Sequence, residues 1–142
     1  MVGPARRFKT ADIAQQLVGG FLLAGPFVVT EEVWVLARSM SVFQGVLTAA
    51  IVGGIGYGAL YKADDRDPDR EVDIGGVPVR FLSLMAVSFG AVLLLALAFD
   101  APTTFLSGLG VERARWPFVT AKAVSVGAVF SVVGAATADS VF

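Results

Sequence analysis

Two adjacent carboxylates, Glu31 and Glu32, interrupt an otherwise apolar part of the sequence. They follow 18 uncharged residues, Ile13 to Thr30, and precede five more before Arg38. An ionisable group inside a membrane-spanning helix is costly unless it is paired or wetted, and such groups commonly mark ion or proton pathways. If the helix continues to Arg38, Glu32 lies six residues, or about 9 Å, from its end.

Two interpretations of this segment stay open. In one, a single helix reaches about residue 37, and the two carboxylates point about 100° apart, so that one of them can face a bundle interior. Thr30 and Glu31 would then support Glu32 in carrying a cation or proton. In the other, the helix ends at Thr30 and both carboxylates lie among the lipid headgroups.

Lys122 is the one charge inside the last apolar stretch, which runs from Trp116 to Ala138. It lies six residues from Trp116, and this depth matches that of Glu32 measured from Arg38. The sequence therefore allows an intramembrane ion pair between Lys122 and either glutamate. The alternative is that the long lysine side chain extends outward to the headgroups.

Most other chemistry is excluded by composition. The chain has no cysteine and no histidine, which rules out disulfides, Cys/His zinc sites, thiol nucleophiles and Ser-His-Asp triads. We therefore expect no enzyme, no cofactor and no nucleic-acid partner, and the sequence assigns no metal. The acidic segment lacks the EF-hand register and is predicted to be a solvated loop; its aspartates are Asp64, Asp65, Asp67, Asp69 and Asp73.

The apolar stretches predict the fold class. Of 142 residues, 56% are hydrophobic and 16% charged, against about 25% charged in soluble domains, and mean hydropathy is +0.75. About 20 apolar residues suffice to cross a bilayer as a helix. The sequence predicts a single transmembrane domain over 1–142, an all-α four-helix bundle with helices at about 13–37, 40–61, 80–99 and 116–138 and a polar loop at 62–79.

Orientation follows from lysine and arginine counts in the short loops. Seven lie on the side of the N-terminus: Arg6, Arg7, Lys9, Lys62, Arg66, Arg70 and Arg80. Three lie on the other side: Arg38, Arg113 and Arg115. We expect a multi-pass protein of the cell membrane with both termini cytoplasmic and with Trp34 and Trp116 in an outer aromatic belt. The excess of Asp over Glu and of Arg over Lys suggests a halophilic habitat.

Small residues recur every four positions on two of the predicted helices. Gly54 and Gly58 lie on the second, and Gly127, Ser131 and Ala135 on the fourth. Such spacing allows helices to approach closely. The contact could lie within one chain or between copies, and because four helices are few for a pathway of their own, we expect a homo-oligomer.

The segment Pro26-Phe27-Val28-Val29-Thr30-Glu31-Glu32-Val33-Trp34 resembles a motif of a family of small integral membrane proteins of unknown function. The motif reads Pro, three apolar residues, Thr, any residue, Glu, any residue, Trp. It covers nine of the 142 residues. The resemblance implies no activity, but it places Thr30, Glu32 and Trp34 on the motif and leaves Glu31 at a variable position.

The function expected from the sequence is passage of cations or protons past outer-leaflet carboxylates in an oligomer. Glu32 would be the main ligand, Glu31 and Thr30 its support, and Lys122 a counter-charge. The partners would be the lipid bilayer, other copies of the chain and an inorganic cation. The alternative is a non-transporting scaffold or accessory subunit of a larger membrane complex.

Overall fold

The computed structural model describes residues 8–63, 67–70 and 72–141 and is built almost entirely of helices. The predicted all-α class is therefore confirmed. The α-helices are α1 (Thr10–Val28), α2 (Glu31–Ser39), α3 (Val42–Gly58), α4 (Val79–Ala98) and α5 (Trp116–Val141). Four helical segments of the described chain are long and apolar enough to cross a membrane: 10–28, 42–62, 79–98 and 113–139.

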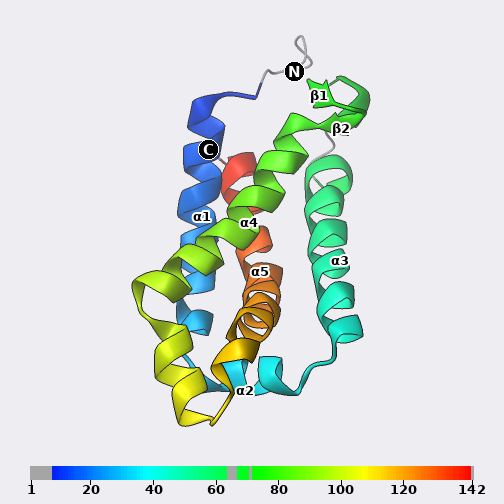
Figure 1. Ribbon diagram of the computed structural model, residues 1–142. Helices are drawn as coiled ribbons and strands as arrows, with labels where there is room; N and C mark the ends of the chain where they lie inside the picture. Colours follow the sequence, from blue (N-terminus) through cyan, green and yellow to red (C-terminus); the bar gives the residue numbers. More distant parts are fainter. Residues whose placement is uncertain (1–7, 64–66, 71, 142) are drawn as a thin grey trace.

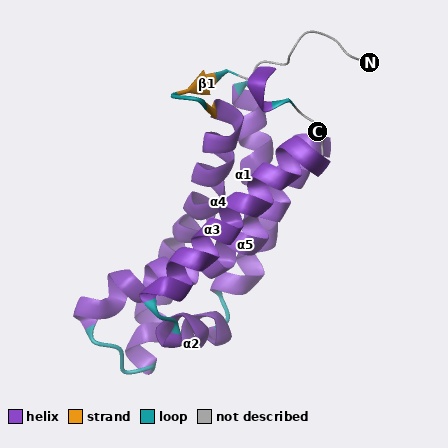
Figure 2. Cartoon of the chain, turned by 90° about the vertical axis from the view of Figure 1, so that its right-hand side faces the viewer, coloured by secondary structure: helices purple, strands orange, loops and turns teal. Residues whose placement is uncertain are grey.

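The long helices form an elongated bundle around α5, which packs against α1, α4 and α3 (Figure 1). The first turns of α1, the last turns of α5 and a small β-hairpin lie together at one end, which we name the hairpin end. The short helix α2 lies at the opposite end, which we name the α2 end (Figure 2).

Short segments complete the chain. The single-turn helices are η1 (Ala59–Ala63), η2 (Pro68–Arg70), η3 (Pro102–Leu106) and η4 (Arg113–Arg115). The predicted loop at 62–79 contains an antiparallel hairpin of β1 (Asp73–Ile74) and β2 (Val77–Pro78), with Ile74 opposite Val77. Gly75 and Gly76 form its turn with φ of +61° and +88°, a conformation that favours glycine. Asp64 and Asp65 lie outside the described residues.

The first predicted helix is wrong in one respect, because the range 13–37 is not a single helix. The α1 helix ends at Val28, and Thr30 is extended, with φ −108° and ψ 136°, before α2 begins at Glu31. Pro26 lies in the last turn of α1. A proline there removes a backbone hydrogen bond and favours a kink or an end to the helix, and the chain turns two residues later.

Small residues bring α1 and α5 into backbone contact. A Cβ atom built on Gly19 would overlap the carbonyl of Gly134, and one on Gly134 would overlap the carbonyl of Gly19. Further along the same face Gly20 lies against Ser131, whose Oγ would be 3.0 Å from an added Cβ. The interface therefore admits no side chain at either of the first two positions, and only glycine fits.

The two sets of small residues singled out from the sequence behave differently. A Cβ on Gly127 would lie 2.7 Å from Val92 Cγ1, and Ser131 and Ala135 are fully buried, so this set packs within the chain. An added Cβ on Gly54 or Gly58 would meet nothing within 4 Å. The α5 set is thus used in the bundle, whereas Gly54 and Gly58 of α3 have no neighbour within the chain at this distance.

Candidate functional site

The predicted carboxylates lie outside the bundle, at the α2 end. Glu31 and Glu32 are the first two residues of α2, and both are exposed. The N-terminus of a helix carries a partial positive charge that stabilises carboxylates in the first turn. Their position at a helix start therefore has a structural reason that needs no bound cation.

Thr30 and Trp34 satisfy the carbonyls at the end of α1. The Thr30 hydroxyl donates to the carbonyl of Phe27 at 2.9 Å, and the Trp34 indole nitrogen donates to the carbonyl of Val28 at 3.1 Å. The last carbonyls of a helix have no partner within it, so these two side chains replace the missing bonds. Trp34 is 1% exposed and stacks on Phe105, which corrects its predicted place in an aromatic belt.

The motif that carried the family resemblance therefore has a geometric meaning in this chain. Pro26 precedes the end of α1, Thr30 and Trp34 bond its terminal carbonyls, and Glu32 lies in the first turn of α2. Together they build a sharp break between two helices. The spacing of these residues in the sequence did not show whether they form a break between two helices or line a polar pathway along one continuous helix.

Lys122 forms a hydrogen bond with a backbone carbonyl instead of the ion pair that the sequence allowed. Its ammonium donates to the carbonyl of Met40 at 2.6 Å, at the end of α2. The lysine stem lies beside Gly45, where an added Cβ would be 3.1 Å from Lys122 Cγ. Within the described chain Lys122 forms no ion pair with Glu31 or Glu32, and its role is to tie α5 to the link between α2 and α3.

A buried polar cluster at the hairpin end was missed by sequence reasoning. Arg80 Nη1 bonds both carboxylate oxygens of Asp139, at 2.8 and 2.9 Å, and Arg80 Nη2 lies 3.5 Å from Asp12 Oδ2. Gln16 donates to Asp139 at 3.3 Å and accepts from the Ser83 hydroxyl at 2.7 Å. We name these five residues the Arg80 cluster; they join α1, α4 and α5.

Three members of the Arg80 cluster are enclosed by protein, and Asp12 and Ser83 are half-buried. Arg80 is 1% exposed, Asp139 4% and Gln16 0%. Removing two opposite charges from water is costly unless further hydrogen bonds satisfy the remaining polar atoms. Both carboxylate oxygens of Asp139 are bonded here, and the Phe8 ring lies 5.1 Å from the Arg80 guanidinium carbon, a distance at which a ring face attracts a cation.

One sequence signal could have located this cluster. Asp139 continues the four-residue series of Ser131 and Ala135, so it lies on the α5 face that packs against α1. Arg80 was predicted to be a loop charge that sets orientation, and Asp139 lies one residue beyond the predicted helix at 116–138. Both are instead part of the helix packing.

Between the two ends the interior holds few polar groups. The hydroxyls of Ser88 and Ser125 donate to carbonyls four residues earlier in their own helices, at 2.6 and 3.0 Å. Ser131 Oγ is buried without a hydrogen-bond partner. In residues 8–63, 67–70 and 72–141 no group of three or more potential metal ligands occurs. The described interior is thus mostly aliphatic, with isolated hydroxyls.

No family model, curated protein or solved structure matches the chain. The resemblance carried by Pro26, Thr30, Glu32 and Trp34 therefore stays a prediction.

Proposed function

We propose that the protein is a multi-pass protein of the cell membrane that acts as a non-transporting scaffold or accessory subunit. Its four apolar helical segments support membrane insertion. The lysine and arginine bias of the sequence supports a cytoplasmic hairpin end and an outer α2 end, with both termini cytoplasmic.

One observation carries the choice of a scaffold over a transporter. The polar groups of the described interior do not connect the Arg80 cluster with Lys122, because Ser88 and Ser125 bond within their own helices and Ser131 has no partner. A conducted ion needs ligands or water along its whole route, because an uncompensated charge in an apolar interior is very costly. A single chain offers no such route among its described residues.

Reconstitution into liposomes tests the choice directly. We expect the purified protein to give no more flux than empty liposomes under gradients of Na⁺, K⁺, Ca²⁺ or H⁺. Flux above that of empty liposomes, at several protein-to-lipid ratios, would overturn the scaffold proposal.

A second candidate is passage of cations or protons between subunits. It is favoured by the exposure of Glu31 and Glu32, which leaves both carboxylates available to a neighbouring copy. If flux is seen, Glu32→Gln should abolish or alter it while the protein stays folded, and Glu31→Gln should do less. Equal flux from both variants and the unmodified protein would remove the carboxylates from the pathway.

Self-association is the structural requirement of that second candidate, and α3 is the helix on which to test it. Gly54→Leu adds a side chain to an outward glycine, so it should leave monomer stability unchanged and weaken any oligomer that uses this face. Gly127→Leu is the contrast, because Val92 fills the space beside Gly127 and the monomer itself should be destabilised. Native mass spectrometry in mild detergent, combined with melting curves, separates the two effects.

Orientation is tested by accessibility labelling, which the absence of native cysteine makes simple. A membrane-impermeant thiol reagent added to intact cells should modify Cys placed at Gly108 and not Cys placed at Asp67. The reverse pattern would place the α2 end in the cytoplasm.

A further inference from the structure

We propose that a groove at the α2 end holds an acyl chain of an anionic phospholipid, and that Arg113 and Arg115 bind the lipid phosphate. The site rests on the proposed membrane location, which supplies the lipid. It goes beyond the scaffold function because it assigns a specific lipid partner to defined residues.

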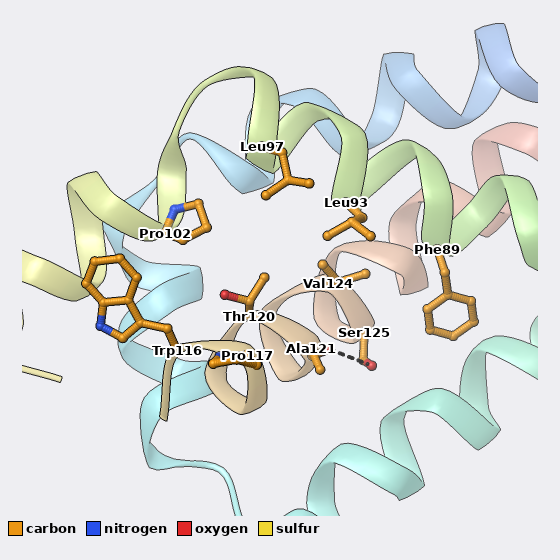
Figure 3. A pocket seen from close by; sticks show the side chains of 10 residues that line it. All are labelled: Phe89, Leu93, Leu97, Pro102, Trp116, Pro117, Thr120, Ala121, Val124 and Ser125. Atoms are coloured by element: carbon orange, nitrogen blue, oxygen red, sulfur yellow. Dashed lines mark hydrogen bonds between the residues drawn. The ribbon is translucent and has the colours of Figure 1, made fainter. Parts of the chain in front are cut away.

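The groove lies along α5 and is bordered by α4 and η3. Figure 1 shows α4 crossing in front of α5, and α3 separating from α4 toward the α2 end. The groove has a volume of about 610 Å³, within the range of small-molecule sites. Figure 3 shows its walls, with Phe89, Leu93 and Leu97 on α4 and Ala121 and Val124 on α5.

The lining suits a hydrocarbon chain and offers little to a polar ligand. Ser125 is one of its two hydroxyl residues, and its Oγ already donates to the carbonyl of Ala121 at 3.0 Å. Thr120 is the other, on the same helix. The remaining walls are apolar. An acyl chain in the groove would therefore cover apolar side chains and would leave no polar group without a hydrogen-bond partner.

The end of the groove nearest the α2 end is closed by Trp116 and bordered by arginine. The Trp116 indole nitrogen donates to the carbonyl of Val111 at 2.9 Å, which fixes the ring, and the Arg113 guanidinium carbon lies 5.2 Å from the ring centre. Arg113 and Arg115 belong to η4, directly before α5, and both are exposed. The Arg113 guanidinium thus lies over Trp116, a residue of the groove wall, and Arg115 follows Arg113 by two residues in the sequence.

Charge complementarity identifies the occupant. In the part of the chain that the structure describes, neither Arg113 nor Arg115 has an ion-pair partner. Guanidinium groups bind phosphate oxygens through paired hydrogen bonds. A phospholipid places an acyl chain and a phosphate next to each other, as the groove and η4 are placed.

The test compares two lipids with identical acyl chains. Delipidated full-length protein in mild detergent is titrated with phosphatidylglycerol or with diacylglycerol, and bound lipid is counted by native mass spectrometry. We expect phosphatidylglycerol to bind about 25-fold more tightly, since each of the two arginines contributes about 1 kcal/mol, or a factor of about five. Arg113→Gln and Arg115→Gln should each weaken its binding about fivefold and leave the binding of diacylglycerol, which has no phosphate, unchanged.

Matched variants control for general effects. Arg38→Gln removes a guanidinium at the same end whose hydrogen bond goes to the carbonyl of Leu109, outside the groove, so it should not alter lipid binding. Ala121→Phe fills the groove and should weaken binding of both lipids, whereas Ala14→Phe on the exposed surface of α1 should not. Melting curves confirm that each variant is folded.

Several results would overturn this site. They are equal affinity of the unmodified protein for the two lipids, equal weakening by Arg38→Gln, or no effect of Ala121→Phe. A dimer that Ala121→Phe dissociates, without any change in lipid binding, would assign the groove to a second copy. Absence of lipid binding by a protein that leaves cell membranes only in detergent would reject the site while the membrane location stands.

Discussion

The two ends of the bundle treat charged residues in opposite ways. At the hairpin end, Arg80 and Asp139 are sealed between three helices and bonded to each other at 2.8 Å. At the α2 end, Glu31 and Glu32 lie exposed on a helix start, and Lys122 bonds a backbone carbonyl rather than a carboxylate. Distance from the edge of an apolar stretch is therefore a poor guide to which charge is buried.

Helix direction explains the contrast. Asp139 lies on the face of α5 that packs against α1, so the close contact at Gly19 and Gly134 carries its carboxylate into the bundle. The break at Thr30 instead turns the chain away from α1 before the glutamates occur. A helix that continued straight would have carried Glu32 along the bundle axis.

The largest expected effect tests whether the hairpin end depends on its ion pair. Asp139→Leu should lower the free energy of unfolding by about 3–5 kcal/mol, because it leaves the Arg80 guanidinium buried without its main partner. Adding Arg80→Met should recover about half of the loss, since it removes the buried guanidinium and leaves only the Asp12 carboxylate, whose side chain is 20% exposed, without its cation. Thermal melting in detergent measures both variants, and a single variant as stable as the unmodified protein would show that water reaches this cluster.

The next effect tests the helix break at the α2 end. Trp34→Phe keeps the aromatic ring in the core but leaves the carbonyl of Val28 without its donor, which should cost about 1–3 kcal/mol. Trp116→Phe is the matched control, because its bond to the carbonyl of Val111 lies in a half-buried site where other donors can replace it. An equal loss from the two variants in chemical unfolding would contradict the assigned role of Trp34.

A smaller effect is expected at Lys122. Lys122→Met keeps the length of the stem and removes the donor to the carbonyl of Met40, which should cost about 1 kcal/mol. The loss should appear equally in proteins that carry Glu32 or Gln at position 32. Melting curves of the four combinations supply the measurement.

The smallest effect is expected at the exposed glutamate. Glu32→Gln should leave the melting midpoint unchanged, and its coupling energy with Lys122→Met should be zero within error, because the two side chains form no ion pair. A coupling energy above about 0.5 kcal/mol would mean that the residues interact, and the contrast between the two ends would then fail.

Several features of the fold were readable from the sequence. Long uncharged stretches predicted the four apolar helical segments, because residues in contact with lipid must be apolar and their backbone must bond internally. Gly127, Ser131 and Ala135 predicted a packing face, and they are used as one. The same spacing at Gly54 and Gly58 has no partner within the chain, since a spacing rule does not say which helix lies opposite.

The candidate site was only partly readable. The sequence pointed to Thr30, Glu32 and Trp34 as a unit, and the structure joins Thr30 and Trp34 to the end of α1. The sequence did not show whether the helix breaks after Pro26 or continues to residue 37, because proline is compatible with both. The outcome depends on which donors bond the carbonyls at the end of α1. Those donors come from side chains three and six residues farther along the chain.

Composition and periodicity by themselves determined that the chain forms long apolar helices with charges at their ends, since these properties depend on each segment and its solvent. Only the tertiary structure decided which charges are enclosed. Arg80 and Asp139 are 59 residues apart in sequence, and Asp139 is 123 residues from Gln16. They meet because α1, α4 and α5 pack together at one end, and a contact of that kind depends on three helices at once rather than on any one of them.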